Sequence, residues 1–253
     1  MKIGVQMYTI RDYLKNPEDI HISLKKVKAL GFDMIQLSGL GPCNIDQLAG
    51  WIKGLGMTVC STHSPWERID DKKELLKLIE EHKKLGASEI GIGMKPDIFP
   101  QSYEGWSRFI KKVNSVCKIC KDNGMTFGYH NHSFEFEKIK GVCIIDRLVE
   151  ECPDMNIILD VFWVQAGGAN PSAYIDKLKG RIQLLHLKDF RIANWDKKFA
   201  EIGNGNLDWN DIIPRARKNG IPYAAIEQDG DFAVEPFESL AASKKYLVKS
   251  GLW

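Results

Sequence analysis

One short pattern recurs six times along the chain and constrains its fold more than any other feature. Each copy is a helix-like segment with a lysine near its end, followed by a glycine and then an apolar run. The glycines are Gly31, Gly56, Gly86, Gly124, Gly180 and Gly220. Glycine just past a helix adopts the left-handed conformation at little cost, and lysine in the last turn complements the helix dipole. Each copy therefore predicts one helix-to-strand junction, spaced roughly as in a chain of βα units.

The apolar runs predict eight strands that alternate with helices. The expected strands cover 2–8, 33–38, 57–62, 89–93, 125–132, 156–161, 182–188 and 223–228. Helical periodicity appears between them, for example in 74–85 and 104–122, and Asn16 followed by Pro17 is a typical helix start. Such alternation with short loops indicates an α/β fold with a parallel sheet. Eight units favour a (β/α)8 TIM barrel in a single domain, 1–253, with an open doubly wound sheet as the alternative.

Composition and charge narrow the classes of function. The 35 basic and 33 acidic residues leave a net charge of +2, which gives no support for attraction to nucleic acid or a membrane. No apolar run approaches the ~20 residues that span a bilayer, and the N-terminus enters a strand without a signal-like segment, so a cytoplasmic location is expected. Cys117 and Cys120 have CxxC spacing but lie in a helical pattern with no second pair, which favours buried reduced thiols.

Polar residues collect at the C-terminal ends of the predicted strands, where the working site of a barrel lies. They are Gln6, Tyr8, His63, His130, His132, Asp160, His186, Lys188 and Glu227. Side chains alternate along a strand, so His130 and His132 face the same way. Each residue alone has an ordinary explanation as a cap or a surface hydrogen bond, and the argument rests on their joint placement. Imidazole and carboxylate together suit Mn²⁺, Zn²⁺, Mg²⁺ or Co²⁺ without selecting among them.

Several segments resemble, in the same order, the sugar phosphate isomerase/epimerase proteins, which share the xylose isomerase-like barrel with the endonuclease IV type proteins. The segments are 4–12, Tyr129-His-Asn-His-Ser-Phe-Glu135, Leu159-Asp160, His186-Leu-Lys-Asp189, 202–205 with Asp208-Trp209, and Glu227-Gln-Asp229. The resemblance covers essentially the whole chain. Its motifs are fairly specific for the family and poorly specific for the substrate.

The resemblance implies a divalent metal held at the ends of the fifth to eighth strands. Three of the usual four ligands carry over to Asp160, His186 and Glu227. The fourth is usually Glu, and this sequence has His130 in its place. Either His130 is the fourth ligand, or Glu135 swings in, or the metal has three protein ligands and water. We favour His130 because it ends the strand, whereas Glu135 lies on the loop.

The resemblance also implies proton abstraction next to a carbonyl of a small carbohydrate, through an enediolate that the metal stabilises. We expect His132 to be the base, with Glu135 fixing its tautomer. Lys188 is expected to bind a hydroxyl or carboxylate group. The expected substrate-binding residues are Gln6, Tyr8, His63, Asn131 and Trp163.

The sequence leaves several activities open. Isomerisation or epimerisation is the first interpretation, although Trp163 stands where many sugar epimerases have a histidine. The Tyr-His-x-His pattern also resembles inosose dehydratases and enzymes that eliminate aglycones from 3-keto-sugars, so a lyase is the alternative. Too few ligands and a near-neutral charge argue against an endonuclease IV-like nuclease. A sugar-binding barrel without activity is a third hypothesis. Family members are often dimers or tetramers, so a homo-oligomer is a further option, for which Trp66 and Trp195 are expected as exposed aromatic residues.

Overall fold

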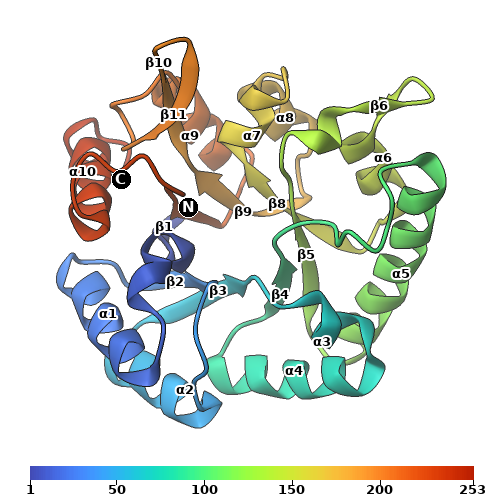
Figure 1. Ribbon diagram of the computed structural model, residues 1–253, viewed down its shortest axis with the longest axis horizontal. Coiled ribbons are helices and arrows are strands. Elements are labelled where there is room, and N and C mark those ends of the chain that lie inside the picture. Colours follow the sequence, from blue (N-terminus) through green and yellow to red (C-terminus); the bar gives the residue numbers. More distant parts are fainter.

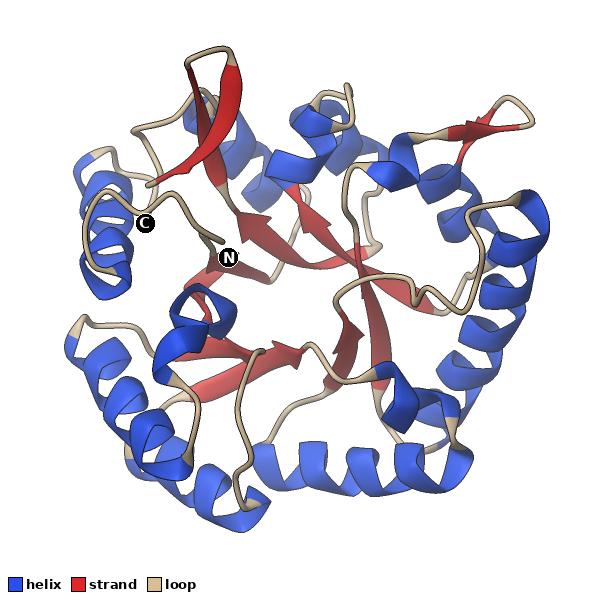
Figure 2. Cartoon of the chain, in the orientation of Figure 1, coloured by secondary structure: helices blue, strands red, loops and turns tan.

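The computed structural model describes residues 1–253 and contains eight parallel strands at its centre (Figures 1 and 2). In spatial order the strands are β3 (Thr58–Thr62), β2 (Met34–Leu37), β1 (Lys2–Gln6), β12 (Tyr223–Ile226), β9 (Ile182–Leu187), β8 (Met155–Asp160), β5 (Thr126–His130) and β4 (Glu89–Ile92). The sheet curls until β3 and β4 meet, and Ser64 N donates to Gly91 O at 2.8 Å across that seam. The predicted TIM barrel is thus confirmed, and the open sheet is excluded.

Helices surround the strands on the outside of the barrel (Figure 2). They are α1 (Pro17–Ala29), α2 (Ile45–Gly54), α3 (Trp66–Asp70), α4 (Lys72–Leu85), α5 (Tyr103–Asp122), α6 (Ile144–Glu151), α7 (Val161–Ala166), α8 (Pro171–Lys177), α9 (Trp209–Lys218) and α10 (Pro236–Lys249), with 3-10 turns η1 (Met7–Tyr13) and η2 (Phe134–Phe136). Asn16 caps α1 by accepting from Asp19 N, as the Asn-Pro start predicts. The apolar faces of the helices pack on the strands, and residues of both form the main core of 59 buried residues.

The repeated junctions form as the sequence indicates. All six junction glycines have φ between +62° and +79°.

The six cysteines are free, and Cys117 and Cys120 are buried in α5. No helix is long and apolar enough to cross a membrane.

Two hairpins and two short helices were not predicted. The hairpins are β6 (Lys138–Ile139) with β7 (Val142–Cys143) after β5, and β10 (Asp189–Ala193) with β11 (Asp196–Ala200) after β9. The helices α3 and α7 follow β3 and β8 directly. All four elements are too short to show a periodic apolar pattern, so a prediction based on periodicity does not detect them. The expected exposure of Trp66 is wrong, since its side chain packs in the core with 8% exposed, whereas Trp195 is fully exposed.

Candidate active site

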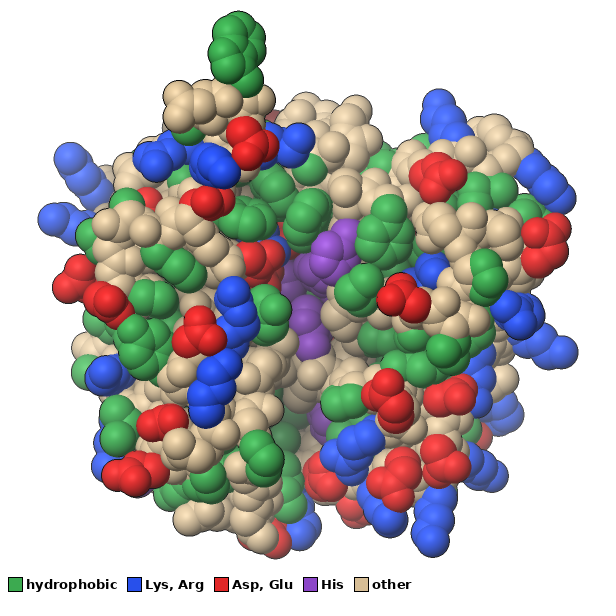
Figure 3. All heavy atoms as spheres, in the orientation of Figure 1, with side chains coloured by type: hydrophobic (Ala, Val, Ile, Leu, Met, Phe, Trp, Pro, Cys, Tyr) green, Lys and Arg blue, Asp and Glu red, His purple; other side chains and the backbone are tan.

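The mouth of the barrel, at the C-terminal ends of the strands, is hollowed into a cavity of about 300 Å³. Figure 3 shows histidine side chains in this hollow, with hydrophobic side chains around it. The lining residues come from both halves of the chain: Tyr8, Ser38, His63, Gly93, Met94, His130, His132, Lys188, Glu227 and Asp229.

Four residues on neighbouring strands bring together nitrogen and oxygen atoms that could hold a metal ion, and two of these residues, His130 and Glu227, line the cavity. His130 ends β5, Asp160 ends β8, His186 lies in β9, and Glu227 follows β12. One ligand atom from each lies within 4.8 Å of the others, and all four side chains are buried. The structure therefore brings together the four residues that the sequence nominates for a metal. Glu135 lies elsewhere, under the loop that follows β5.

Hydrogen bonds behind the two imidazoles aim them at the centre of this group. His130 Nδ1 lies 2.8 Å from Gly93 O, and His186 Nε2 lies 2.6 Å from Gln36 Oε1. Both partners are acceptors, so each of these ring nitrogens carries the proton. The opposite nitrogens, Nε2 of His130 and Nδ1 of His186, are then free lone-pair donors that face the carboxylates. This is the usual arrangement of outer-shell partners behind metal-binding histidines.

Asp160 and Asn131 together fix the end of β8. Asp160 Oδ1 accepts from the backbone N–H groups of Phe162 and Trp163 at 2.9 and 3.2 Å, which caps α7. Its Oδ2 faces His130 Nε2 at 3.4 Å. Asn131 is fully buried, and its Oδ1 accepts from Asp160 N at 2.9 Å. Asn131 therefore holds the ligand-bearing backbone and does not line the cavity.

Lys188 supplies a positive charge among the carboxylates. Its ammonium lies 3.0 Å from Asp160 Oδ2, 3.0 Å from Glu227 Oε2 and 2.9 Å from Asp229 Oδ2. Burial opposes the charged form of Lys188, but attraction to these three carboxylates outweighs it and raises the pKa. Burial likewise raises the pKa of Asp160 and Glu227, but Lys188 and the histidines outweigh it and lower both values. Asp160 and Glu227 are thus held ionised, with Lys188 as their buried counter-charge.

The donor set fits a divalent ion. His186 Nδ1 is buried without a hydrogen-bond partner and lies 2.8 Å from Glu227 Oε2, an oxygen that also faces the Lys188 ammonium at 3.0 Å. Buried polar atoms without partners are costly and uncommon. Two imidazoles and two carboxylates match the ligand preferences of Zn²⁺, Mn²⁺ or Co²⁺.

His132 faces the same cavity beside this cluster. Its ring stacks on Phe134 at 5.6 Å and lies 5.0 Å from the ring of Trp163, while its Nδ1 has no partner. Burial and repulsion from His130 lower the pKa of His132 to about 3. The ring is therefore neutral at neutral pH.

Glu135 does not contact the His132 ring, so the expected tautomer-fixing bond is absent. Glu135 Oε2 accepts from the backbone N–H of His132 at 2.8 Å, and Tyr129 OH donates to Oε1 at 2.5 Å. Burial raises the pKa of Glu135 to about 7. Glu135 therefore sets the path of the chain that carries His132. The spacing of His132 and Glu135 in the sequence predicted a contact between them, but it did not predict whether Glu135 would reach the ring or the backbone of His132.

The remaining nominated residues surround the cavity. Gln6 does not line the cavity: it is fully buried, with Oε1 accepting from Tyr8 N and Nε2 3.5 Å from His63 Nδ1. Tyr8 and His63 line the cavity. Trp163 borders the cluster, with Lys188 Nζ 5.5 Å from its ring centroid.

Sequence reasoning missed Asp229, Gln36 and Gly93 as parts of the site. Asp229 lines the cavity and pairs with Lys188. Its position two residues after Glu227 was a usable signal, because residues i and i+2 of an extended chain share a face. Gln36 and the carbonyl of Gly93 carried no such signal. Each orients a histidine on another strand, and the sequence does not say which strands lie close enough for that contact.

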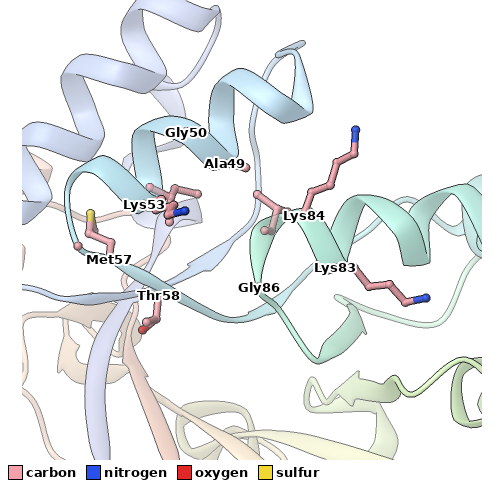
Figure 4. Close-up of a pocket in the computed structure, with 11 residues that line it drawn as sticks. Ala49, Gly50, Lys53, Met57, Thr58, Lys83, Lys84 and Gly86 are labelled. Atoms are coloured by element: carbon pink, nitrogen blue, oxygen red, sulfur yellow. The ribbon is translucent and has the colours of Figure 1, made fainter.

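A larger hollow, of about 580 Å³, lies at the opposite end of the barrel (Figure 4). Its polar side chains are mainly those of Lys53, Lys83 and Lys84. Lys83 and Lys84 pair with Glu80 and Asp46, and no carboxylate or imidazole lines the hollow. It therefore lacks the groups for acid–base or metal chemistry.

A family model described as "Xylose isomerase-like TIM barrel" matches residues 24–244. The chain belongs to this family. It is 24% identical over 163 residues to an inosose dehydratase from Clostridium beijerinckii, a match that covers 57% of this chain and 54% of the relative. The chain thus matches about half the length of this curated relative.

Two solved structures show the same fold. A sugar phosphate isomerase/epimerase from Parabacteroides distasonis superposes with a TM-score of 0.79 at 23% identity, covering 99% of this chain and 94% of the other. The IOLI protein, whose crystal structure holds a zinc atom, superposes with a TM-score of 0.74 at 15% identity, covering 100% and 99%.

Proposed function

We propose that this chain is a divalent-metal-dependent isomerase or epimerase of a small sugar or sugar phosphate. The observation that carries the proposal is the convergence of four buried ligand atoms within 4.8 Å, in the cavity that His132 also lines. A cavity of about 300 Å³ suits a small molecule, at the low end of the range for ligand sites. The family and its sugar-processing members support a carbohydrate.

Each residue has a role in this proposal. His130, Asp160, His186 and Glu227 would hold the ion, which would supply a Lewis acid for the substrate carbonyl. His132, neutral and unpartnered at Nδ1, takes the proton from the carbon next to the carbonyl. Returning that proton to the neighbouring carbon, while the hydroxyl proton moves to the former carbonyl oxygen, isomerises the sugar. Protonation of the original carbon from the opposite face, by a donor other than His132, epimerises it.

Other side chains bind and enclose the substrate. Lys188 and Asp229 meet substrate hydroxyl or carboxylate groups at the cavity wall. Tyr8 and His63 contact further hydroxyls from the other side, and the buried Gln6 positions both of them. Trp163 forms an apolar wall beside His132 and excludes water there.

A dehydratase or lyase acting on an inosose or a 3-keto-glycoside is the second candidate. The similarity to inosose dehydratases supports it. The first step is the same proton abstraction, after which a β-hydroxyl or aglycone leaves in place of proton return.

The test is hydrogen exchange in D₂O with ketoses, inososes and 3-keto-glucosides, using protein loaded with Mn²⁺, Zn²⁺ or Co²⁺ and protein stripped of metal. We expect deuterium next to the carbonyl of one class only with loaded protein, and His132→Ala to lower exchange at least about 100-fold, as loss of a general base does. Metal content should be unchanged in this variant.

The matched control is His21→Ala. His21 lies on α1 outside the barrel, stacked on Trp51 at 4.5 Å, and its loss should leave exchange unchanged. Full exchange by His132→Ala would remove His132 as the base. Metal-loaded protein that exchanges none of the substrates, yet binds one of them, would replace the enzyme with a sugar-binding barrel.

A further inference from the structure

A groove of about 460 Å³ opens beside the active-site cavity, between α3 and the segment that follows β4 (Figure 1). Gly93 and Met94 line both the groove and the cavity, so the two hollows meet at these residues. Trp66 of α3 lines the groove from one side, and Pro96 and Ile98 of the segment line it from the other. A substituent on a molecule bound in the cavity therefore has a place to lie in the groove.

Buried contacts hold the segment after β4 and so fix the shape of the groove. Lys95 is 5% exposed, and its ammonium donates to the carbonyl oxygen of Phe99 and lies 5.1 Å from the centre of the Trp106 ring. The Phe99 ring packs edge-on against Trp66 with centroids 5.6 Å apart. Lysine is rarely buried unless its ammonium is paired, so these contacts tie the segment to the barrel. The groove is thus formed before any ligand binds, which lowers the cost of binding.

The groove presents apolar side chains that nothing in the chain covers. Met94 is 46% exposed and Ile98 is 64% exposed. Single exposed apolar residues are ordinary, but these two line one concave site with Trp66 and Pro96, next to the cavity. Apolar walls are typical of small-molecule sites, and the thioether of methionine makes favourable contacts with aromatic rings. The groove therefore suits an aromatic ring.

Charges around the groove disfavour an anionic ligand. The exposed acids Glu67 and Asp97 line it, and no lysine or arginine does. Lys95 lies in the same segment but is buried and donates to a backbone carbonyl, and Arg68 of α3 pairs with Glu81 through two hydrogen bonds. A carboxylate or phosphate group in the groove would meet repulsion and no free cation. The group that fits is therefore uncharged.

We propose that the groove is a subsite that binds an uncharged aromatic substituent of the substrate, whose sugar ring lies in the cavity. The substrate is then an aryl glycoside, with its two rings on either side of Met94. This inference rests on the proposed function, since it takes the cavity to bind the sugar, and it adds a part of the substrate that the proposed reaction leaves open. Ile98, Glu67 and Asp97 line the groove and not the cavity, so they select the substituent without contacting the sugar.

The test compares the affinities of phenyl and methyl 3-keto-glucoside by calorimetry, with Mn²⁺-loaded protein that carries His132→Ala. This background lacks the proposed base, so the ligands bind without reacting. The phenyl ligand is expected to bind at least about 10-fold more tightly, as burial of an apolar ring predicts. Ile98→Asp should remove this preference, because a carboxylate then replaces part of the apolar wall. The matched control is Ile22→Asp, 45% exposed on α1 outside the barrel, which should keep the preference.

A second comparison tests the charge of the groove. The 4-carboxyphenyl 3-keto-glucoside is expected to bind at least about 10-fold more weakly than the phenyl ligand, because its carboxylate meets Glu67 and Asp97. Glu67→Lys with Asp97→Lys should reverse that order. Both side chains are exposed, and circular dichroism should show folded protein.

Equal affinity for the phenyl and methyl ligands would overturn the subsite and leave the proposed reaction standing. A phenyl preference that Ile98→Asp leaves intact would also overturn it, as would a carboxyphenyl ligand that binds as tightly as the phenyl ligand. Protein that binds neither the phenyl nor the methyl ligand would overturn the subsite. It would overturn the proposed function as well only if no ketone exchanges deuterium in D₂O, so the two failures are distinguishable.

Discussion

Asp160 divides its two carboxylate oxygens between two tasks. Oδ1 caps α7 through two backbone N–H groups, while Oδ2 faces His130 Nε2 and is the oxygen that we propose for the metal. Substitution by asparagine keeps a carbonyl oxygen for the cap and replaces the ligand oxygen with an amide nitrogen that cannot bind a metal.

We therefore expect Asp160→Asn to stay folded and to lose most of its bound divalent metal, measured by elemental analysis after dialysis. The matched control is Asp71→Asn. Asp71 caps α4 through Lys73 N and Glu74 N in the same way but is exposed and does not line the cavity. Metal retained by Asp160→Asn at the wild-type level would show that Asp160 is not a ligand.

Glu89 is a second buried carboxyl that the proposed chemistry does not use. It is fully buried at the start of β4, accepts from Asn156 Nδ2 at 2.8 Å, and leaves Oε1 without a partner. Burial raises the pKa of Glu89 to about 7, and hydrogen bonds from Asn156 and its neighbours reduce that effect. Between pH 4.5 and about 7, Glu89 is therefore protonated in the native state and ionised in the unfolded chain.

The sign of the effect follows from this difference. Stability from the protonated Glu89 is fully present below the unfolded pKa of 4.5 and is lost as the pH rises to about 7. We expect Glu89→Gln, which stays neutral, to be more stable than wild type by on the order of 3 kcal/mol above pH 7, with the gap closing toward pH 4.5. Urea unfolding across this range measures it, with exposed Glu104→Gln as control. A gap that does not vary with pH would contradict the assignment.

At the scale of elements, Asp189 joins β9 to the segment before α9. This buried carboxylate accepts from Trp209 Nε1 at 2.7 Å, Gly203 N at 3.0 Å and Leu207 N at 3.2 Å. The β10–β11 hairpin is inserted within this span, so Asp189 closes its base. The Gly-Asn-Gly turn at 203–205 and the helix start at Asp208 are thereby held to the end of the strand that carries His186.

We expect Asp189→Asn to lower the free energy of unfolding by at least about 2 kcal/mol, because an amide NH₂ would face donors that now bind a carboxylate oxygen. Asp196→Asn, on the exposed tip of the same hairpin, should change it by less than about 0.5 kcal/mol. Equal effects of the two substitutions in urea unfolding would show that the buried bonds contribute no more than an exposed pair.

At the scale of the whole molecule, the barrel closes where β3 meets β4. Gly91 makes this closure possible, since a Cβ there would lie 2.1 Å from the backbone oxygen of Thr62 and 2.9 Å from Ile158 Cδ1. Neither strand can move away without opening the barrel, because each is paired on its other side.

Gly91→Ala is therefore expected to lower stability by about 2 kcal/mol or more and to reduce amide protection on β3 and β4 first. Gly54→Ala, in α2 with nothing within 4 Å of a Cβ, should be neutral or slightly stabilising. Hydrogen exchange and thermal unfolding measure both variants. Unchanged protection at the seam would contradict closure at Gly91.

Sequence alone determined the order of elements and the end of the barrel where the polar residues lie. Both follow from local chemistry, because the junction glycines, the helix caps and the alternation along strands act within a few residues of each other. The eight strands and the placement of His130, Asp160, His186 and Glu227 at one end were predicted on this basis.

Only the tertiary structure decided what those residues touch. Asn131 was expected to bind substrate, yet it holds the backbone of Asp160, and Glu135 reaches the backbone of His132 and not its ring. Gln36 and Gly93, which orient the two imidazoles, are distant in sequence from the histidines that they contact. The physical reason is that hydrogen bonds are decided over a few tenths of an ångström between atoms on different strands, and residue spacing along one strand carries no information on that distance.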